Sequence, residues 1–485
     1  MTDRTSRPTK WVISAAFLAS SLIARSAAAD VTLTEHDGWE VFLNGRIQTF
    51  TNYNQGNGRP NKVNDGTGTP VELRGGGLEN TEGVLPEYAN GVEATLTDQG
   101  KVQEMRVRSG FTGNVLGFGI RKKISEDTEI LGYTAVTVGI DSEQRRKFAL
   151  VRPDWRESFV RITSSWGSLT AGRALTLFSR GATEITYLYG YRYGLGFPGT
   201  VTNFSQSTAG SVGFGVLGNG FGAGIAYATP RLGGVQLTVG LYDANTLPNT
   251  PLLNRAKWPR GEGEATFERK FGATGFVKLF VNGAFQRLYD IDGRPLYADA
   301  YGTGFGGRFE FGPVKLGLAG HMGKGVGVTY SLEPHYSVYF IERTREAFTV
   351  QDSSCAMTGR GCPPVKLRTV DGYYAQAQVA LHKTVDVRAG GGITRVYQLP
   401  EDKDPSWKLA NQMAPGSDPS VGHITLKHQI GIGAGATFHL NESLHLTVEY
   451  FRAMYQWYKP VPAAPGQANP SQVMNFVNAG ITYDF

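Results

Sequence analysis

Hydrophobic residues recur at every second position over long stretches of this chain. In the last thirteen residues, one face carries Val473, Val477, Ala479, Ile481, Tyr483 and Phe485, and most polar residues fall on the other. The same alternation runs through 39–53, 235–242, 424–438 and 444–450. A period of two is typical of half-buried β-strands, because successive side chains point to opposite faces. The pattern therefore predicts an all-β fold.

Short turns and long polar connections alternate between these strands. Seven tight turns are expected at 125–128, 164–167, 230–234, 271–273, 312–313, 382–384 and 441–443. Eight long connections are expected at 55–103, 142–156, 175–209, 244–261, 289–300, 324–370, 398–421 and 460–471. Fifteen connections join sixteen strands. Short turns at one end and long loops at the other are typical of transmembrane antiparallel β-barrels. The last strand must then pair with the first, near 39–53, because an open edge leaves backbone groups unpaired.

The charged residues on the polar faces indicate which face of each strand points into the barrel. Mean hydropathy is -0.24, which fits a soluble all-β protein and also a barrel that is apolar only at alternate positions. The faces expected to be polar carry Arg46, Arg121, Lys278, Arg308, Lys315, Arg388 and Lys427. So many charges cannot be packed in a dry core. We therefore expect a water-filled lumen and an apolar face that contacts lipid.

The first 29 residues have the order of a secretory signal peptide. Arg4, Arg7 and Lys10 precede a short apolar run at 11–23, and a small-residue site follows at 27–29. A short membrane anchor is the alternative interpretation. Cleavage would leave a barrel domain of residues 30–485 and would lower the net charge from +6 to +3. A nucleic-acid partner is therefore not expected.

Other motifs give little indication of chemistry. Cys355 and Cys362 are the two cysteines, and export favours a local disulfide between them over a two-ligand metal site. The GxGxxG matches at 213–218 and 302–307 do not lie between a strand and a helix, so they predict no phosphate site. The sequence contains neither GxSxG nor HExxH, and its histidines are scattered. We expect no enzymatic activity, cofactor or metal.

Three segments resemble the general porins of Gram-negative outer membranes. They are the strand pair at 156–173 that ends in Gly-Arg, the Tyr-x-x-Pro turn within 225–234, and the C-terminal strand with Ile481, Tyr483 and Phe485. The resemblance implies a homotrimeric, sixteen-stranded pore in the outer membrane, in contact with lipid and lipopolysaccharide. It also implies that the chain end is the signal read by the barrel assembly machinery.

The same resemblance implies that the third loop, 175–209, folds into the lumen and forms the constriction. In this family acidic loop residues face basic wall residues. Glu184 matches the acidic side, while Arg46 and Arg173 match the wall. Arg173 shares the parity of outward positions, so it needs a bulge to face the lumen. Further basic candidates are Arg180, Arg192, Arg308, Lys278 and Lys427, and the loop also carries Tyr187, Tyr189, Tyr191 and Tyr193. These tyrosines fit either packing against the wall or a sugar-stacking track.

The first functional hypothesis is a passive diffusion channel for small hydrophilic solutes and ions. Inward basic residues outnumber Glu184 and Glu310, which favours a slight anion preference. Three glutamates on one strand face, Glu262, Glu264 and Glu268, could offset it. The alternatives are a substrate-specific channel for anions or sugars, and a structural or adhesive barrel with a closed lumen.

Overall fold

The structure is a computed structural model that describes residues 30–57, 62–64, 66–68, 70–74, 101–109, 113–138, 154–189, 211–218, 220–244, 256–289, 297–327, 367–403, 422–461 and 463–485. The helices are α1 (Arg180–Tyr189) and the 3-10 helix η3 (Pro400–Lys403). The strands are β1 (Val31–His36), β2 (Trp39–Asn57), β3 (Lys62–Asn64), β4 (Pro70–Arg74), β5 (Lys101–Arg108), β6 (Asn114–Lys123), β7 (Glu129–Val138), β8 (Asp154–Ser164), β9 (Gly167–Leu175), β10 (Phe221–Ala228), β11 (Val235–Tyr242), β12 (Arg260–Phe271), β13 (Gly275–Tyr289), β14 (Tyr297–Phe311), β15 (Val314–Lys324), β16 (Thr369–His382), β17 (Val385–Val396), β18 (Gly422–His439), β19 (Leu444–Trp457) and β20 (Ser471–Asp484). Within these residues, no helix has the length and hydropathy needed to span a membrane.

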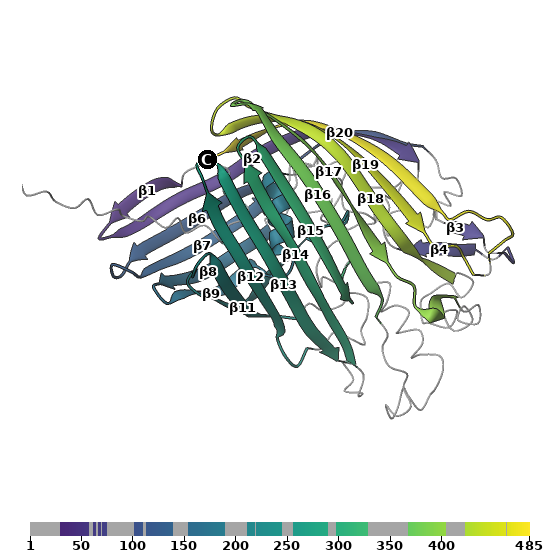
Figure 1. Cartoon of the computed structure of the whole chain (residues 1–485), viewed down its shortest axis with the longest axis horizontal. Coiled ribbons are helices and arrows are strands. Elements are labelled where there is room, and N and C mark those ends of the chain that lie inside the picture. The colour runs from purple at the N-terminus through teal and green to yellow at the C-terminus, as the bar shows by residue number, and fades with distance from the viewer. Residues whose placement is uncertain are drawn as a thin grey trace, which may run out of the picture.

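The strands close into an antiparallel barrel of sixteen, as predicted (Figure 1). Strands β6 to β20 each pair with the next, and β20 pairs with β2. β5 and β6 pair with successive parts of β2, at 50–57 and 39–46 respectively. They therefore act as one wall strand that is interrupted near 109–113.

The barrel closes at a seam between β2 and β20. Two backbone hydrogen bonds join Gly45 to Phe485, with N···O distances of 2.7 and 3.0 Å. The C-terminus accordingly lies beside β2 in Figure 1. β20 pairs with β2 only from Arg46 onward. β1 pairs with β2 over 39–43 and so covers the part of the β2 edge that β20 does not reach. The sequence pattern did not predict β1.

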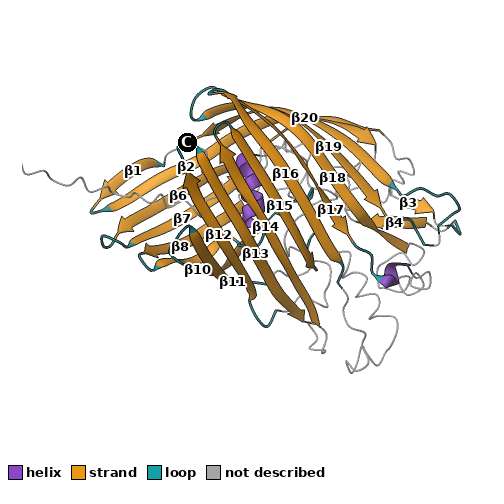
Figure 2. Ribbon diagram, viewed as in Figure 1, coloured by secondary structure: helices purple, strands orange, loops and turns teal. Residues whose placement is uncertain are grey.

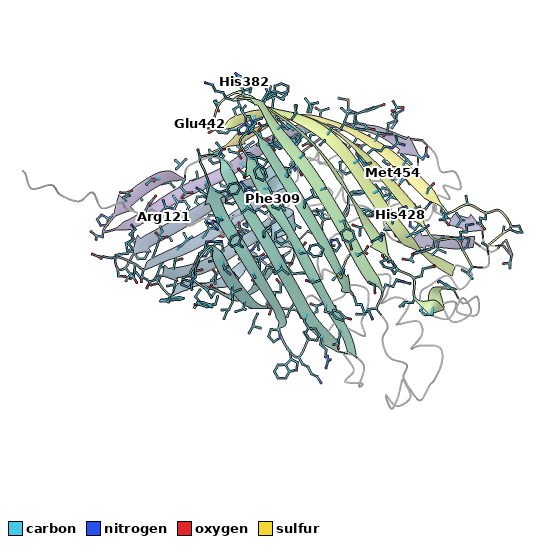
Figure 3. All side chains as sticks on the ribbon, in the orientation of Figure 1. Arg121, Phe309, His382, His428, Glu442 and Met454 are labelled. Atoms are coloured by element: carbon cyan, nitrogen blue, oxygen red, sulfur yellow. The ribbon has the colours of Figure 1, made fainter. Side chains whose placement is uncertain are left out.

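All seven predicted turns and all eight predicted long connections join the expected strand pairs. His382 and Glu442, in two of the short turns, lie at the same end of the barrel (Figure 3). The connection at 55–103 differs from expectation because it contains β3 and β4. β4 runs parallel to the start of β18, at 422–425, and so extends the wall there.

The apolar faces point outward, as predicted. Val239 on β11 and Ile481 and Tyr483 on β20 are 60%, 43% and 47% exposed, whereas Thr482 and Asp484, which alternate with the latter two, are buried. One stretch departs from the prediction. β18 shifts register between Leu426 and His428, so Ile424 and Leu426 turn inward although the simple period places them outside.

Part of the lumen is packed with apolar side chains. An inner cluster combines Phe451, Tyr455, Trp457, Met474 and Phe476, from β19 and β20, with Phe214 from the connection after β9. All are at most 1% exposed. The expectation of a wet, polar inner face therefore does not hold where β19 ends and β20 begins. The open part of the lumen is narrower than the ring of strands suggests.

Candidate pore constriction

The chain leaves the wall at the end of β9 and enters the lumen. The amide N–H groups of Leu177 and Phe178 both donate to Oε2 of Glu262 on β12, at 2.6 and 2.8 Å. The N–H of Ser179 donates to Oδ1 of Asn282 on β13, at 3.2 Å. An ionised acceptor makes such hydrogen bonds roughly twice as strong as neutral ones. The wall therefore holds this stretch by its backbone.

Ser179 sets the start of α1. It has a φ of 68°, which is strained for a residue other than glycine. Its hydroxyl donates to the carbonyl of Leu217 at 2.6 Å, and its carbonyl accepts the N–H of Thr183 at 3.1 Å. The outgoing and returning halves of the loop are thus tied together at the first turn of the helix.

α1 lies inside the barrel, behind β14 and β15 (Figure 2). Its Gly181 meets the ring of Phe280 so closely that a Cβ there would lie 2.5 Å from ring carbons. Ile185 packs against Gly317 on β15, where a Cβ would lie 2.3 Å from its methyl carbon. Glycine has no side chain, and one glycine on the helix and one on the wall allow this close approach.

The third connection extends up to β10 at Phe221 rather than ending at 209 as predicted, and its returning segment, 211–218, docks against β16 to β19. The N–H of Gly215 donates to Oγ1 of Thr394 at 2.9 Å, and Gln429 donates to the carbonyl of Gly213. The ring of Phe214 lies edge-on to those of Phe451 and Tyr455, with centroids 5.3 and 5.8 Å away. Loop 3 is therefore anchored on both sides of the lumen.

Opposite charges meet between α1 and the wall. Nζ of Lys278 lies 2.6 Å from Oε2 of Glu184, and Nη1 of Arg308 lies 3.9 Å from Oε1 of the same carboxylate. Lys278 also lies 3.3 Å from Glu268, and Arg308 pairs with Glu310. The structure thus brings together Glu184, Lys278 and Arg308, three of the residues selected from the sequence.

A second group of charges has the reverse arrangement. Arg180 on α1 pairs with Glu264 on the wall. Burial opposes the charge of Arg180, but its neighbours, chiefly the Glu264 carboxylate, hold the pKa of the guanidinium above its ordinary value. Next to this pair, Arg260 lies 2.7 Å from Glu262 and 5.6 Å from the ring centroid of Tyr242. The loop is therefore not simply acidic, nor the wall simply basic.

Arg173 lies on the outer face of the barrel and not in the lumen, where the resemblance had placed it. Strand β9 pairs with β8 and β10 in an uninterrupted register, so the bulge that Arg173 needed is absent from this strand. The residue is exposed, on the same side as Leu169. Its parity, readable in the sequence, already indicated this position.

Two other predicted wall residues lie away from α1 in the contacts that the structure gives. Arg46 faces the lumen and pairs with Asp484 at the seam. Lys427 lies at the register shift in β18 and is half-buried. Several predictions lie outside the described residues: Tyr191, Arg192, Tyr193, Cys355, Cys362, the segment 1–29, and the side chains of Tyr187 and Tyr189.

Sequence patterns did not reveal the anchors of loop 3. The alternation placed Glu262 and Glu264 on one face, but not their bonds to residues more than 80 positions away. Asn282 and Thr394 carried no motif at all. Among the described residues, no group of three or more His, Cys, Asp or Glu side chains is arranged to hold a metal ion.

Comparisons with known proteins agree with this architecture. The outer membrane channel DcaP of Acinetobacter baumannii is 10% identical, with 94% of this chain and 100% of that chain covered and a TM-score of 0.55. The anion-selective porin from Comamonas acidovorans is 12% identical, with 92% and 100% covered and a TM-score of 0.50. At these identities the likeness shows the fold alone. A search of curated proteins gave no match.

The assignment of the chain rests on the family profile. The profile described as Gram-negative porin matches residues 14–452, which is most of the chain. The closed barrel and the inward third loop fit the same assignment. The chain therefore belongs to the Gram-negative porin family and is an outer-membrane channel.

Proposed function

We propose that this channel passes small hydrophilic solutes and ions by passive diffusion, with a slight anion preference and without enzymatic activity. The observation that carries the proposal is the docking of α1 inside the barrel, with Glu184 held between Lys278 and Arg308. A fixed helix narrows the lumen and sets the size limit. The charges that line the remaining passage then sort ions by sign.

The proposed anion preference depends on which carboxylates already have hydrogen-bond or ion-pair partners. Glu262 already accepts two backbone N–H groups and lies 2.7 Å from Arg260. Glu264 is paired with Arg180. Arg161, in contrast, donates to the hydroxyl of Thr170 at 3.0 Å and lies 4.8 Å from the ring centroid of Phe159. Each of these pairs cancels one positive and one negative charge, so the slight preference rests on inward cations such as Arg161, for which the structure gives no ion pair among the described residues.

We further propose a homotrimer. Near the seam, the outward faces of four adjacent strands carry polar side chains, which are unusual on a surface that contacts lipid. Arg452 is exposed, Tyr450 donates to Asn475 at 2.7 Å, and Gln103 donates to Tyr53 at 2.9 Å. Polar side chains on an outward face favour a protein neighbour over lipid, and closed rings of identical chains are a common form of assembly. Light scattering of the detergent-solubilised protein measures the assembly, and a monomer mass would refute it.

Single-channel recording in planar bilayers tests the function. A large, linear conductance supports general diffusion. Block by one particular solute would instead support the substrate-specific alternative, and no conductance would refute both in favour of a closed barrel. The reversal potential in a salt gradient measures selectivity. A potential of cation-selective sign would refute the anion preference while leaving the diffusion channel intact.

A further inference from the structure

Two histidines face each other across the hairpin of β18 and β19. His439 is the last residue of β18, and His445 is its direct partner in the ladder. The turn between them is fixed by backbone bonds from Leu440 and Asn441 to the carbonyl of Leu444, at 2.9 and 3.4 Å. Glu442, labelled in Figure 3, marks this turn. Directly opposed side chains on a tight hairpin are held close with little freedom.

The two imidazoles converge through the same ring nitrogen. Nδ1 of His439 lies 2.9 Å from Nδ1 of His445, and the rings are nearly perpendicular, at 83°. At this distance the two nitrogens share a single proton, so one ring donates and the other accepts. Replacing that proton by a metal ion requires only a small outward movement, because tetrahedral Zn²⁺ holds two nitrogens about 3.3 Å apart.

Each ring presents its other nitrogen to a carboxylate. Nε2 of His439 lies 2.9 Å from Asp386, whose second contact is the amide of Gln378, also at 2.9 Å. Nε2 of His445 lies 3.6 Å from Asp484. Metal-ligating histidines almost always donate their second N–H to such a group, which fixes the tautomer and makes the ligand more basic. His439 therefore has the outer-shell carboxylate of a metal ligand, and Asp484 lies just beyond hydrogen-bonding distance of His445.

The site is also accessible from solvent. Both side chains face inward, and that of His439 is 29% exposed while that of His445 is 5% exposed. Water in the lumen can supply the remaining ligands, as in open metal sites. Asp386 adds negative charge beside the two imidazoles, whereas the charge of Asp484 is largely neutralised by Arg46.

We propose that His439 and His445 form a binding site for a divalent transition-metal ion at the short-turn end of the pore. Imidazole nitrogens select ions such as Zn²⁺, Ni²⁺ and Cu²⁺ over Mg²⁺ and Ca²⁺, which prefer oxygen. The two Nδ1 atoms are the protein ligands, and lumen water completes the coordination. Asp386 acts as a positioning residue.

Titration calorimetry of the detergent-solubilised full chain with Zn²⁺ alone tests the site, and Cu²⁺ paramagnetic resonance reports the nitrogen ligands. The intact protein should bind one ion per chain through two nitrogens. His439→Gln and His445→Gln should each abolish this binding, and Asp386→Asn should weaken it by roughly 10- to 100-fold. His382→Gln, in the turn between β16 and β17, is the matched control and should leave it unchanged.

Two results would overturn the proposal: no saturable binding at millimolar metal, or binding that survives in His439→Gln. If His445→Gln fails to fold, the half-exposed His439 still provides the decisive variant, with heat-modifiable electrophoretic mobility as the check for a folded barrel. Single-channel conductance without metal does not depend on this site. A failure to bind metal at this site would therefore leave the proposed diffusion function untouched.

Discussion

The ammonium nitrogen of Lys278 lies 2.6 Å from a carboxylate oxygen of Glu184, which joins the barrel wall to α1 by a pair of opposite charges. Glu184→Gln removes the anion and leaves Lys278 and Arg308 to attract passing anions. The chloride-to-potassium permeability ratio should rise by about fivefold at most, since one screened charge is worth about 1 kcal/mol. Reversal potentials measure the ratio. Lys278→Met is the complementary variant and should lower it, so shifts of the same sign in both would contradict the arrangement.

Glu262 should control how firmly loop 3 stays in the lumen. Glu262→Ala leaves the N–H groups of Leu177 and Phe178 without their acceptor, at a cost of about 1–3 kcal/mol for each buried group. The loop should loosen, which raises the conductance and the open-channel noise in single-channel records. Glu268→Ala is the control, because Glu268 pairs with the side chains of Lys278 and Arg231 and not with the loop backbone. Equal noise in the two variants would count against this role.

Gly215 should be indispensable for docking the returning half of the loop. Its φ is 86°, and a Cβ at this position would lie 2.0 Å from the carbonyl oxygen of Tyr373 on the wall. Gly215→Ala should therefore displace the segment 211–218, with a loss of at least about 1 kcal/mol from the backbone conformation alone. Protease cleavage within loop 3 measures the displacement. Gly261→Ala, where a Cβ meets nothing within 4 Å, should remain resistant.

The last residue should be needed to close the barrel. Deleting Phe485 removes both backbone bonds to Gly45, whereas Phe485→Ala keeps them and loses only the ring that stacks on Tyr483 at 5.8 Å. The deletion should reduce the folded fraction in outer-membrane preparations more than the substitution does. Heat-modifiable mobility on gels reports this fraction. An equal loss in both variants would show that the ring, rather than the seam, is what matters.

Local patterns predicted the wall of the barrel well. The period of two, combined with the placement of short turns, is enough to define the strands and their order, because each hairpin pairs neighbours in sequence. The same patterns fail where one residue changes the phase. The register shift next to Lys427 turns Leu426 inward, and no composition signal marks it.

The interior could be predicted only in part. Lys278 and Arg308 were selected by charge and parity and Glu184 by the resemblance, and the three do meet. The anchors at Glu262 and Thr394 could not be found, because each bonds a backbone N–H, a group that every residue but proline carries. The choice of Arg173 followed the resemblance against its own parity, and the parity was right.

The seam also determines when this barrel can form. Arg46 and Asp484 meet although 438 positions separate them in the chain. Such a contact carries the largest entropy of loop closure, and topologies that depend on distant contacts fold slowly. Until the chain end has been exported, the part of β2 that pairs with β20, at 46–56, has no partner on its seam side, and an open edge can pair with other chains. β2, among the first strands to leave the cell interior, is thus completed only by the last one.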